Sequence, residues 1–201
     1  MTKPDRRTER TRAALMSAFI SVLLSEGYDA VTVERVADAA NIGRSTFYLH
    51  YTGKEDILRQ SLTRPSGMLA VLVGNTLPPG ALAKQLEHFH EQRRRNHIFF
   101  EGQARRIWVS CLAGLIEPRL AALARQTGAR PVIPLALAAL QLAEGQIALV
   151  ANWLSVKPAV KAELVAEALS ATTRGQVAAL LGLGANAPLT IAGERLAVRE
   201  A

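Results

Sequence analysis

One short stretch of the sequence crowds together residue types that can bind nucleic acid. It runs from Asn41 to Lys54 and reads NIGRSTFYLHYTGK. An arginine can donate two hydrogen bonds to a guanine edge, a threonine can touch a thymine methyl group or a phosphate, and tyrosine and histidine can reach phosphates or bases. A lysine at a helix start can hold a phosphate together with free backbone N–H groups. The candidate contacts are Arg44, Thr46, Tyr48, His50 and Lys54, with Thr32 at the start of the preceding helix.

Three helices are expected to position this stretch. Apolar residues recur at helical spacing from Arg6 to Ser25, and Thr32 can cap a second helix that carries Val36 and Ala37 on one face. About three residues separate this helix from another, expected from Arg44 to about Tyr51. Two short helices joined by so short a break form the helix-turn-helix pattern.

The break and the third helix separate buried from displayed residues. Asn41 tolerates the left-handed backbone that ends a helix. At 3.6 residues per turn, Phe47 and Tyr51 share a face that can join a small core, while Arg44 and Tyr48 project elsewhere. The same segment can therefore bury its apolar residues and display its polar ones.

The composition favours an all-α protein. The chain has 201 residues, of which 49% are hydrophobic and only 5% aromatic, and Val, Ile and Thr do not alternate as they do in strands. A single cysteine, Cys111, excludes an intramolecular disulfide, and no signal segment opens the chain, so we expect a reducing cytoplasm. The net charge of +7 is weak evidence for DNA binding, because residues 1–60 carry nine Lys/Arg against eight Asp/Glu.

One apolar run, Pro134 to Leu154, is long enough to cross a membrane. Four polar residues interrupt it, and a carboxylate such as Glu144 near the bilayer centre costs roughly 3 kcal/mol on insertion scales. The run therefore fits a soluble helix buried on several faces better than a membrane span.

The run VTVERVADAANIGRSTFYLHYTGKEDIL, residues 31–58, closely resembles the DNA-binding segment of TetR-type transcriptional regulators. The resemblance implies a short helix that enters the major groove of DNA, with a tyrosine and a lysine that hold phosphates. Two departures are conformationally mild: Asn41 where glycine is usual, and Gly43 where serine often caps the helix. The DNA contacts implied in this chain are Thr32, Arg44, Ser45, Thr46, Tyr48, His50 and Lys54.

The rest of the chain resembles the family only in architecture. We expect a helix-turn-helix domain over residues 1–62, a helical effector-binding and dimerisation domain over residues 63–182, and a flexible tail over residues 183–201. Proline should stop a helix within Thr63–Gly67, and a kink or break is expected near Pro118. The expected helices run over about Gly80–Arg94, Asn96–Glu101, Val132–Leu154 and Ala159–Leu181.

The resemblance implies a homodimer formed by the two long closing helices, which suits double-stranded DNA with a palindromic site. Their apolar residues, such as Leu142, Trp153 and Leu164, exceed what one thin bundle would hide. It also implies a pocket for an unknown small-molecule effector before these helices. Core packing and interhelical hydrogen bonds explain the candidate contacts equally well; these candidates are Phe99, Phe100, Trp108, Cys111, Gln141 and Glu144.

Neither a metal site nor an enzyme is predicted. His88 and His90 do not share a helix face. His90 and His97 do share one, but Arg94 lies on the same face and would place a positive charge beside the metal. The sequence has no phosphate-cradling glycine loop, no G-x-S-x-G and no H-E-x-x-H, so no cofactor is predicted either. The leading hypothesis is a dimeric, ligand-responsive repressor. A regulator of the same fold that answers to a protein partner or to no ligand is the alternative, and a helical enzyme or carrier is a remote one.

Overall fold

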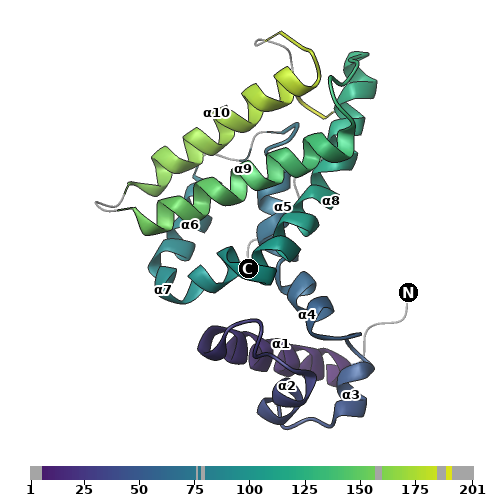
Figure 1. Ribbon diagram of the computed structural model, residues 1–201, viewed down its shortest axis with the longest axis vertical. Coiled ribbons are helices and arrows are strands. Elements are labelled where there is room, and N and C mark those ends of the chain that lie inside the picture. The colour runs from purple at the N-terminus through teal and green to yellow at the C-terminus, as the bar shows by residue number, and fades with distance from the viewer. Residues whose placement is uncertain (1–5, 76, 78–79, 157–159, 185–188, 192–201) are drawn as a thin grey trace. The chain divides into compact units, whose positions relative to one another are not determined.

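The computed structural model describes residues 6–75, 77, 80–156, 160–184 and 189–191, and all of its regular elements in these ranges are helical (Figure 1). The expected all-α class is confirmed. The chain divides into two compact units. The first contains Met1–Thr63 and Arg94–Trp108, and the second contains Arg64–Arg93 and Val109–Ala201. The first unit thus holds the expected helix-turn-helix residues together with a segment that the sequence placed in the second domain.

The first unit is built on a small apolar core. Its helices are α1 (Arg6–Glu26), α2 (Val33–Ala39), α3 (Arg44–Tyr48) and α4 (Lys54–Ser61), followed later in the chain by the 3₁₀ helix η1 (His97–Phe100). Helix α1 buries Leu15, Phe19 and Leu23 completely, at the spacing of one helix face. Phe47 and Tyr51 are buried as well, with their ring centroids 5.6 Å apart, as the sequence predicted.

Helix α3 is shorter than expected. It ends at Tyr48 rather than near Tyr51, because the backbone N–H of Leu49 donates to Thr46 and that of His50 donates to Phe47. Bonds of this i to i−3 type tighten the last turn of a helix. The residues that follow Tyr48 therefore belong to a turn, which still brings Tyr51 into the core.

The second unit contains the longer helices. They are α5 (Thr63–Val71), α6 (Ala81–Glu91), most of α8 (Gly102–Thr127), α9 (Leu135–Ser155) and α10 (Ala162–Leu180), and the short α7 (Arg93–Asn96) lies at the unit boundary. Helices α9 and α10 run side by side, and α6 packs on α10 (Figure 1). The two long closing helices are thus present, each starting about three residues later than predicted.

Two prolines expected to interrupt helices do not do so. Pro65 is the third residue of α5, where its missing N–H would have had no partner in the helix. The break falls instead at Leu62, the C-cap of α4. Pro118 lies inside the continuous α8, so the helix does not break there, and a kink at this point stays a prediction. Proline removes one helical hydrogen bond there, and Ile116 and Leu120, both completely buried, hold the helix on either side.

The residues after α10 do not all leave the second unit. Leu189 is buried, and the backbone N–H of Ile191 donates to the carbonyl of Gly74 at 2.7 Å. Gly74 has φ of +94°, and a Cβ there would lie 2.6 Å from Cγ1 of Ile191, so this contact requires glycine. The described part of the expected flexible tail is therefore packed against the end of α5, and residues 192–201 lie outside the described ranges.

Two helices of the described chain, α8 and α9, are long and apolar enough to cross a membrane by length and composition alone, and 39% of the most apolar window of each is buried. Core helices of soluble proteins pass the same test. Glu144, near the middle of α9, argues against a bilayer.

Candidate nucleic-acid interface

Helix α3 presents an exposed face on one side and is anchored on the other. Phe47 is completely buried, whereas Arg44 and Ser45 are exposed and Tyr48 is 57% exposed. The rings of Phe47 and Tyr48 meet edge to face at 5.6 Å, so the buried ring supports the displayed one. The remaining candidates on this segment, Thr46 and His50, are half-buried.

The turn before α3 is fixed by backbone geometry. Asn41 has φ of +54° and is the described non-glycine residue with positive φ, as predicted. Its N–H donates to Asp38, and the N–H of Ile42 donates to Ala37 at 2.9 Å, which together form a Schellman motif. Gly43 follows as the N-cap of α3 with φ of −64° and no side-chain cap. The turn thus ends α2 and starts α3 with only four residues, Ala40 to Gly43, between the two helices.

Thr32 caps the start of α2. Its Oγ1 accepts a hydrogen bond from the backbone N–H of Arg35 at 3.3 Å, which confirms the predicted N-cap. The hydroxyl of Thr32 also hydrogen-bonds the carboxylate of Glu34, which helps to lower the pKa of Glu34. An exposed hydroxyl at a helix N-terminus suits a phosphate oxygen.

A salt bridge links the two helices of the motif. Nη1 of Arg44 on α3 donates to Oε1 of Glu34 on α2, and the two side chains are 63% and 52% exposed. The pKa of Glu34 lies below its ordinary value, first through a hydrogen bond from its own backbone N–H and then through Arg44. The arginine keeps further N–H donors, since a guanidinium has five. The salt bridge therefore orients the Arg44 side chain and leaves other guanidinium N–H groups able to donate hydrogen bonds.

Lys54 ties the start of α4 to the segment between α1 and α2. Its Nζ donates to the carbonyls of Tyr28 at 3.2 Å and Asp29 at 3.4 Å, and lies 4.7 Å from the centre of the Tyr28 ring. An ammonium group has three donors, so one proton remains for a phosphate. The predicted phosphate ligand therefore also has a structural role that the sequence did not indicate.

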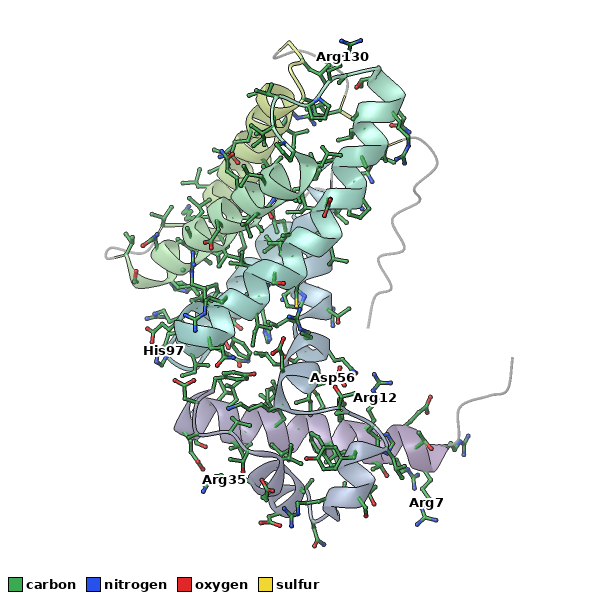
Figure 2. All side chains as sticks on the ribbon, turned by 45° about the vertical axis from the view of Figure 1, so that its right-hand side comes forward. Arg7, Arg12, Arg35, Asp56, His97 and Arg130 are labelled. Atoms are coloured by element: carbon green, nitrogen blue, oxygen red, sulfur yellow. The ribbon has the colours of Figure 1, made fainter. Side chains whose placement is uncertain are left out.

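Basic side chains of α1 and α2 surround this framework (Figure 2). Arg12 donates to the side chain of Gln60 on α4, and its guanidinium lies 5.8 Å from the centre of the Tyr51 ring. Arg35 on α2 pairs with Glu26 at the end of α1. These contacts hold α1 against α2 and α4. Helix α3 is therefore displayed by a set of helices that are fixed to one another.

Sequence reasoning missed two residues of this face. Glu34 was not singled out, because ten residues and a turn separate it from Arg44 and no spacing rule joins them. Leu49 is the C-cap of α3 and is 81% exposed, although its type suits a core. The sequence did hold a signal for this exposure, because Leu49 does not share the helix face of Phe47 and Tyr51.

The candidate effector residues lie in different units. Phe99, Phe100 and Trp108 form an aromatic cluster in the first unit, with ring centroids 6.4 and 4.9 Å from Trp108. Cys111 and Glu144 in the second unit are half-buried, and Gln141 is exposed. A cavity of about 520 Å³ lies within the second unit and is lined by other residues. Ligand contact by the six residues thus stays a prediction.

The histidines do not gather into a metal site. Within the described ranges, no three residues of the types His, Cys, Asp and Glu come together as metal ligands would. His90 instead packs its ring against Trp153, with the centroids 5.2 Å apart.

A short helix displayed across a Schellman turn, with an oriented arginine on its exposed face, is the geometry of a helix-turn-helix DNA-binding segment. Comparison with known proteins agrees for the N-terminal helices. The family described as "Bacterial regulatory proteins, tetR family" matches residues 15–60. These residues are thus a helix-turn-helix segment of the TetR type.

The relatives agree with this assignment. The uncharacterized HTH-type transcriptional regulator YxbF of Bacillus subtilis (strain 168) is 43% identical over 61 residues, which are 30% of this chain and 16% of YxbF. A TetR transcriptional regulator from Streptococcus agalactiae 2603V has the same fold, with a TM-score of 0.56, 25% identity and coverage of 84% of this chain and 96% of that one. Thermus thermophilus FadR, solved with lauroyl-CoA, aligns with a TM-score of 0.51 and 19% identity over 82% of this chain and 94% of that one. This chain thus matches less than a third of the length of its curated relatives.

Proposed function

We propose that this regulator is a cytoplasmic, dimeric repressor that binds a palindromic operator through α3 and leaves it when a small-molecule effector binds. The observation that carries the proposal is the exposed face of α3, where Arg44 and Tyr48 are displayed by the buried anchor Phe47. A helix held in this way can enter the major groove, where base pairs differ in their donors and acceptors.

The residues of this face divide between bases and backbone. Arg44 donates to a guanine edge, and Leu49 contacts a thymine methyl group. Tyr48, Lys54 and Thr32 bind phosphates and thereby set the register of α3 along the groove. The remaining candidates, Ser45, Thr46 and His50, lie on the same segment and add hydrogen bonds from beside these anchors.

A second copy of the chain covers the outer face of α9 and α10. The apolar residues named from the sequence, such as Leu142 and Trp153, are buried within the chain and are not available for this purpose. Leu164 on α10, also named from the sequence, is 55% exposed, and on α9 two leucines that were not named are exposed as well, Leu137 at 53% and Leu140 at 43%. Large apolar side chains exposed together favour a partner. Two copies would present two α3 helices to half-sites about 34–36 Å apart or a multiple of this.

An effector acts only if it binds the two conformations with different affinity. The second unit offers a cavity of about 520 Å³, within the range of small-molecule sites. The structural neighbour from Thermus thermophilus is described in complex with lauroyl-CoA, which supports a ligand for this fold without naming the one used here. Control by a protein partner, or by no ligand, is the alternative, and no observation favours an enzyme or carrier.

Selection from random-sequence duplex DNA tests the proposal. After repeated rounds of binding to the full chain, the recovered pool should converge on an inverted repeat. A pool that stays random would exclude a sequence-specific regulator. Enrichment of a single half-site without its inverted copy would exclude the proposed dimer.

A further inference from the structure

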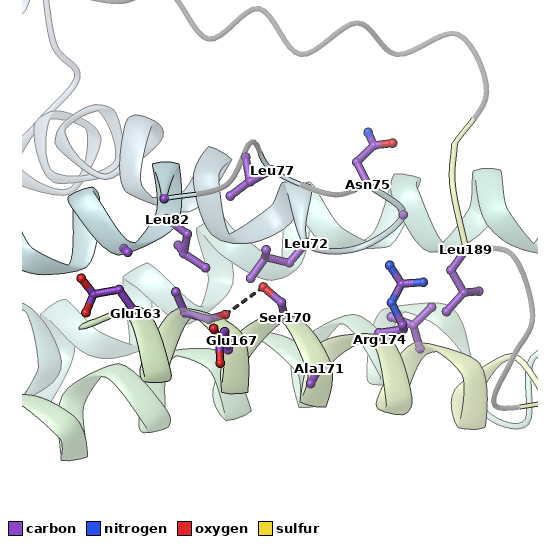
Figure 3. A pocket seen from close by; sticks show the side chains of 15 residues that line it. Leu72, Asn75, Leu77, Leu82, Glu163, Glu167, Ser170, Ala171, Arg174 and Leu189 are labelled. Atoms are coloured by element: carbon purple, nitrogen blue, oxygen red, sulfur yellow. Dashed lines mark hydrogen bonds between the residues drawn. The ribbon is translucent and has the colours of Figure 1, made fainter. Parts of the chain in front are cut away.

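The cavity of the second unit lies between α10 and a wall formed by α6 and by described residues at and after the end of α5 (Figure 3). Its volume is about 520 Å³. Most of the lining is apolar and comes from Leu72 near the end of α5, Leu82 on α6, Val177 on α10 and Leu189 beyond it. Such walls favour a ligand with an apolar body.

Charged groups of opposite sign stand along one wall. Glu163 and Glu167 lie one turn apart on α10, and Arg174 lies seven residues further along the same helix, about 10 Å by the helix rise. Figure 3 places the carboxylates toward one end of the cavity and the guanidinium toward the other, beside Leu189. Among the described residues, none of these three side chains forms an ion pair.

The end of the cavity near Arg174 is held in place by the chain itself. Leu189 is buried, and two residues later Ile191 donates its N–H to Gly74, which also lines the cavity. From α8, Nε of Arg119 donates to the carbonyl of Val73 at 2.8 Å. The wall opposite α10 is therefore fixed from two sides, as a preformed ligand site requires.

We propose that this cavity binds an elongated zwitterion: a molecule with an apolar middle, a cationic group that faces Glu163 and Glu167, and an anionic group that faces Arg174. Glu163, Glu167 and Arg174 are exposed to water, and a purely apolar ligand that covered them would take that water away without replacing its hydrogen bonds, which is unfavourable. A ligand with a single charge would leave one end of the wall unpaired. The zwitterion satisfies both ends and the apolar walls together.

The inference rests on the effector part of the proposed function and gives that effector a chemical class. It also moves the site from the aromatic candidates, such as Phe99 and Trp108, to the wall formed by α10. A ligand there contacts α6, α10 and the segment after α10 at once, so its binding can differ between conformations in which these elements move.

Three octyl compounds serve as probes: ω-aminooctanoic acid carries both charges, octylamine only the cation and octanoic acid only the anion. Protein NMR titrations without DNA give the dissociation constants. We expect ω-aminooctanoic acid to bind tightest. The double variant Glu163→Gln/Glu167→Gln should weaken ω-aminooctanoic acid and octylamine by about fivefold and leave octanoic acid unchanged. Arg174→Gln should weaken ω-aminooctanoic acid and octanoic acid by a similar factor and leave octylamine unchanged.

Matched variants on an exposed part of α8, Glu117→Gln and Arg125→Gln, should change no dissociation constant. Octanol, which has the same chain without a charge, should bind more weakly than all three probes. Equal affinity for octanol and ω-aminooctanoic acid, or equal loss in the control variants, would overturn the assignment. If no probe binds while the selected DNA repeat is still preferred, the cavity assignment fails and the DNA-binding proposal stands. If the probes bind as expected and no DNA sequence is preferred, the cavity assignment stands and the DNA-binding proposal fails.

Discussion

The carboxylate of Glu34 on α2 holds the guanidinium of Arg44 on α3 in the absence of DNA. Both side chains are more than half exposed, at 52% and 63%, so the pair itself contributes little to stability. The effect of the pair is to orient the side chain of Arg44. A flexible side chain that is already placed loses less rotamer entropy when it binds a base. Glu34 is therefore a positioning residue for the arginine that we propose to read guanine.

Replacing Glu34 by glutamine should lower sequence discrimination. The neutral amide holds Arg44 more weakly, and the loss of a negative charge near the DNA backbone raises affinity for every sequence. We expect the ratio of affinities for the selected repeat and for scrambled DNA to fall by roughly two- to fivefold. Fluorescence anisotropy at fixed salt measures both affinities. Glu55→Gln, which breaks the pair with Arg59 within α4, is the matched control and should leave the ratio unchanged.

The left-handed residue of the turn should tolerate little change. Asn41→Ala places a side chain without a compensating polar group at φ of +54°, and we expect a loss of about 1 kcal/mol in the free energy of unfolding. Gly43→Ser, two residues on, has an ordinary φ of −64° and adds an N-cap, so it should stabilise by a few tenths of a kcal/mol. Urea unfolding followed by circular dichroism compares the two. Equal effects of the same sign would contradict the turn geometry.

A buried polar contact joins three helices of the second unit. Nε2 of Gln146 on α9 donates to Thr173 on α10 at 3.0 Å and to the carbonyl of Leu69 on α5 at 3.3 Å. Thr173→Val should cost about 1 kcal/mol, because it removes one acceptor from a buried donor. Adding Gln146→Met should cost less than the sum of the two single changes, since neither partner is then left alone. Strict additivity in urea unfolding would show that the bond contributes nothing.

Acid should weaken the first unit through Asp56. Burial raises the pKa of this carboxyl, but hydrogen bonds from the backbone N–H of Thr52, at 2.9 Å, and from Gln60 outweigh burial, so the pKa lies below its ordinary 3.8. A lowered pKa in the folded state gives stability that is present above the ordinary value and is lost as the pH falls through the folded one. The stability advantage over Asp56→Asn should therefore be constant from about pH 7 to 5 and shrink below about pH 4. An advantage that grows on acidification would contradict this.

The helix-turn-helix could be predicted because its determinants are local. Thr32 caps within three residues, Asn41 carries its own conformational preference, and Phe47 and Tyr51 are four residues apart. The pair of Glu34 and Arg44 could not, since it depends on how the turn places one helix against another.

The second unit was less predictable because its helices are apolar on several faces. Composition does not distinguish the buried Leu142 from the exposed Leu140 on α9, so the outer surface was misjudged. Pro65 and Pro118 have the same intrinsic effect on a helix. One was harmless because it fell in a first turn, and the other because buried neighbours supported it. The cavity combines residues from four separate segments and left no local pattern.

A salt series that compares the affinity of the full chain for its selected repeat and for scrambled DNA tests whether α3 reads a DNA sequence. We expect the repeat to bind at least about a thousandfold more tightly than scrambled DNA at physiological salt, and its affinity to fall steeply as salt rises. Arg44→Ala should cost about 1–3 kcal/mol on the repeat and relax the preference at one base pair. Equal affinity for the repeat and scrambled DNA, or an Arg44→Ala variant with unchanged preference at every position, would contradict this role of α3.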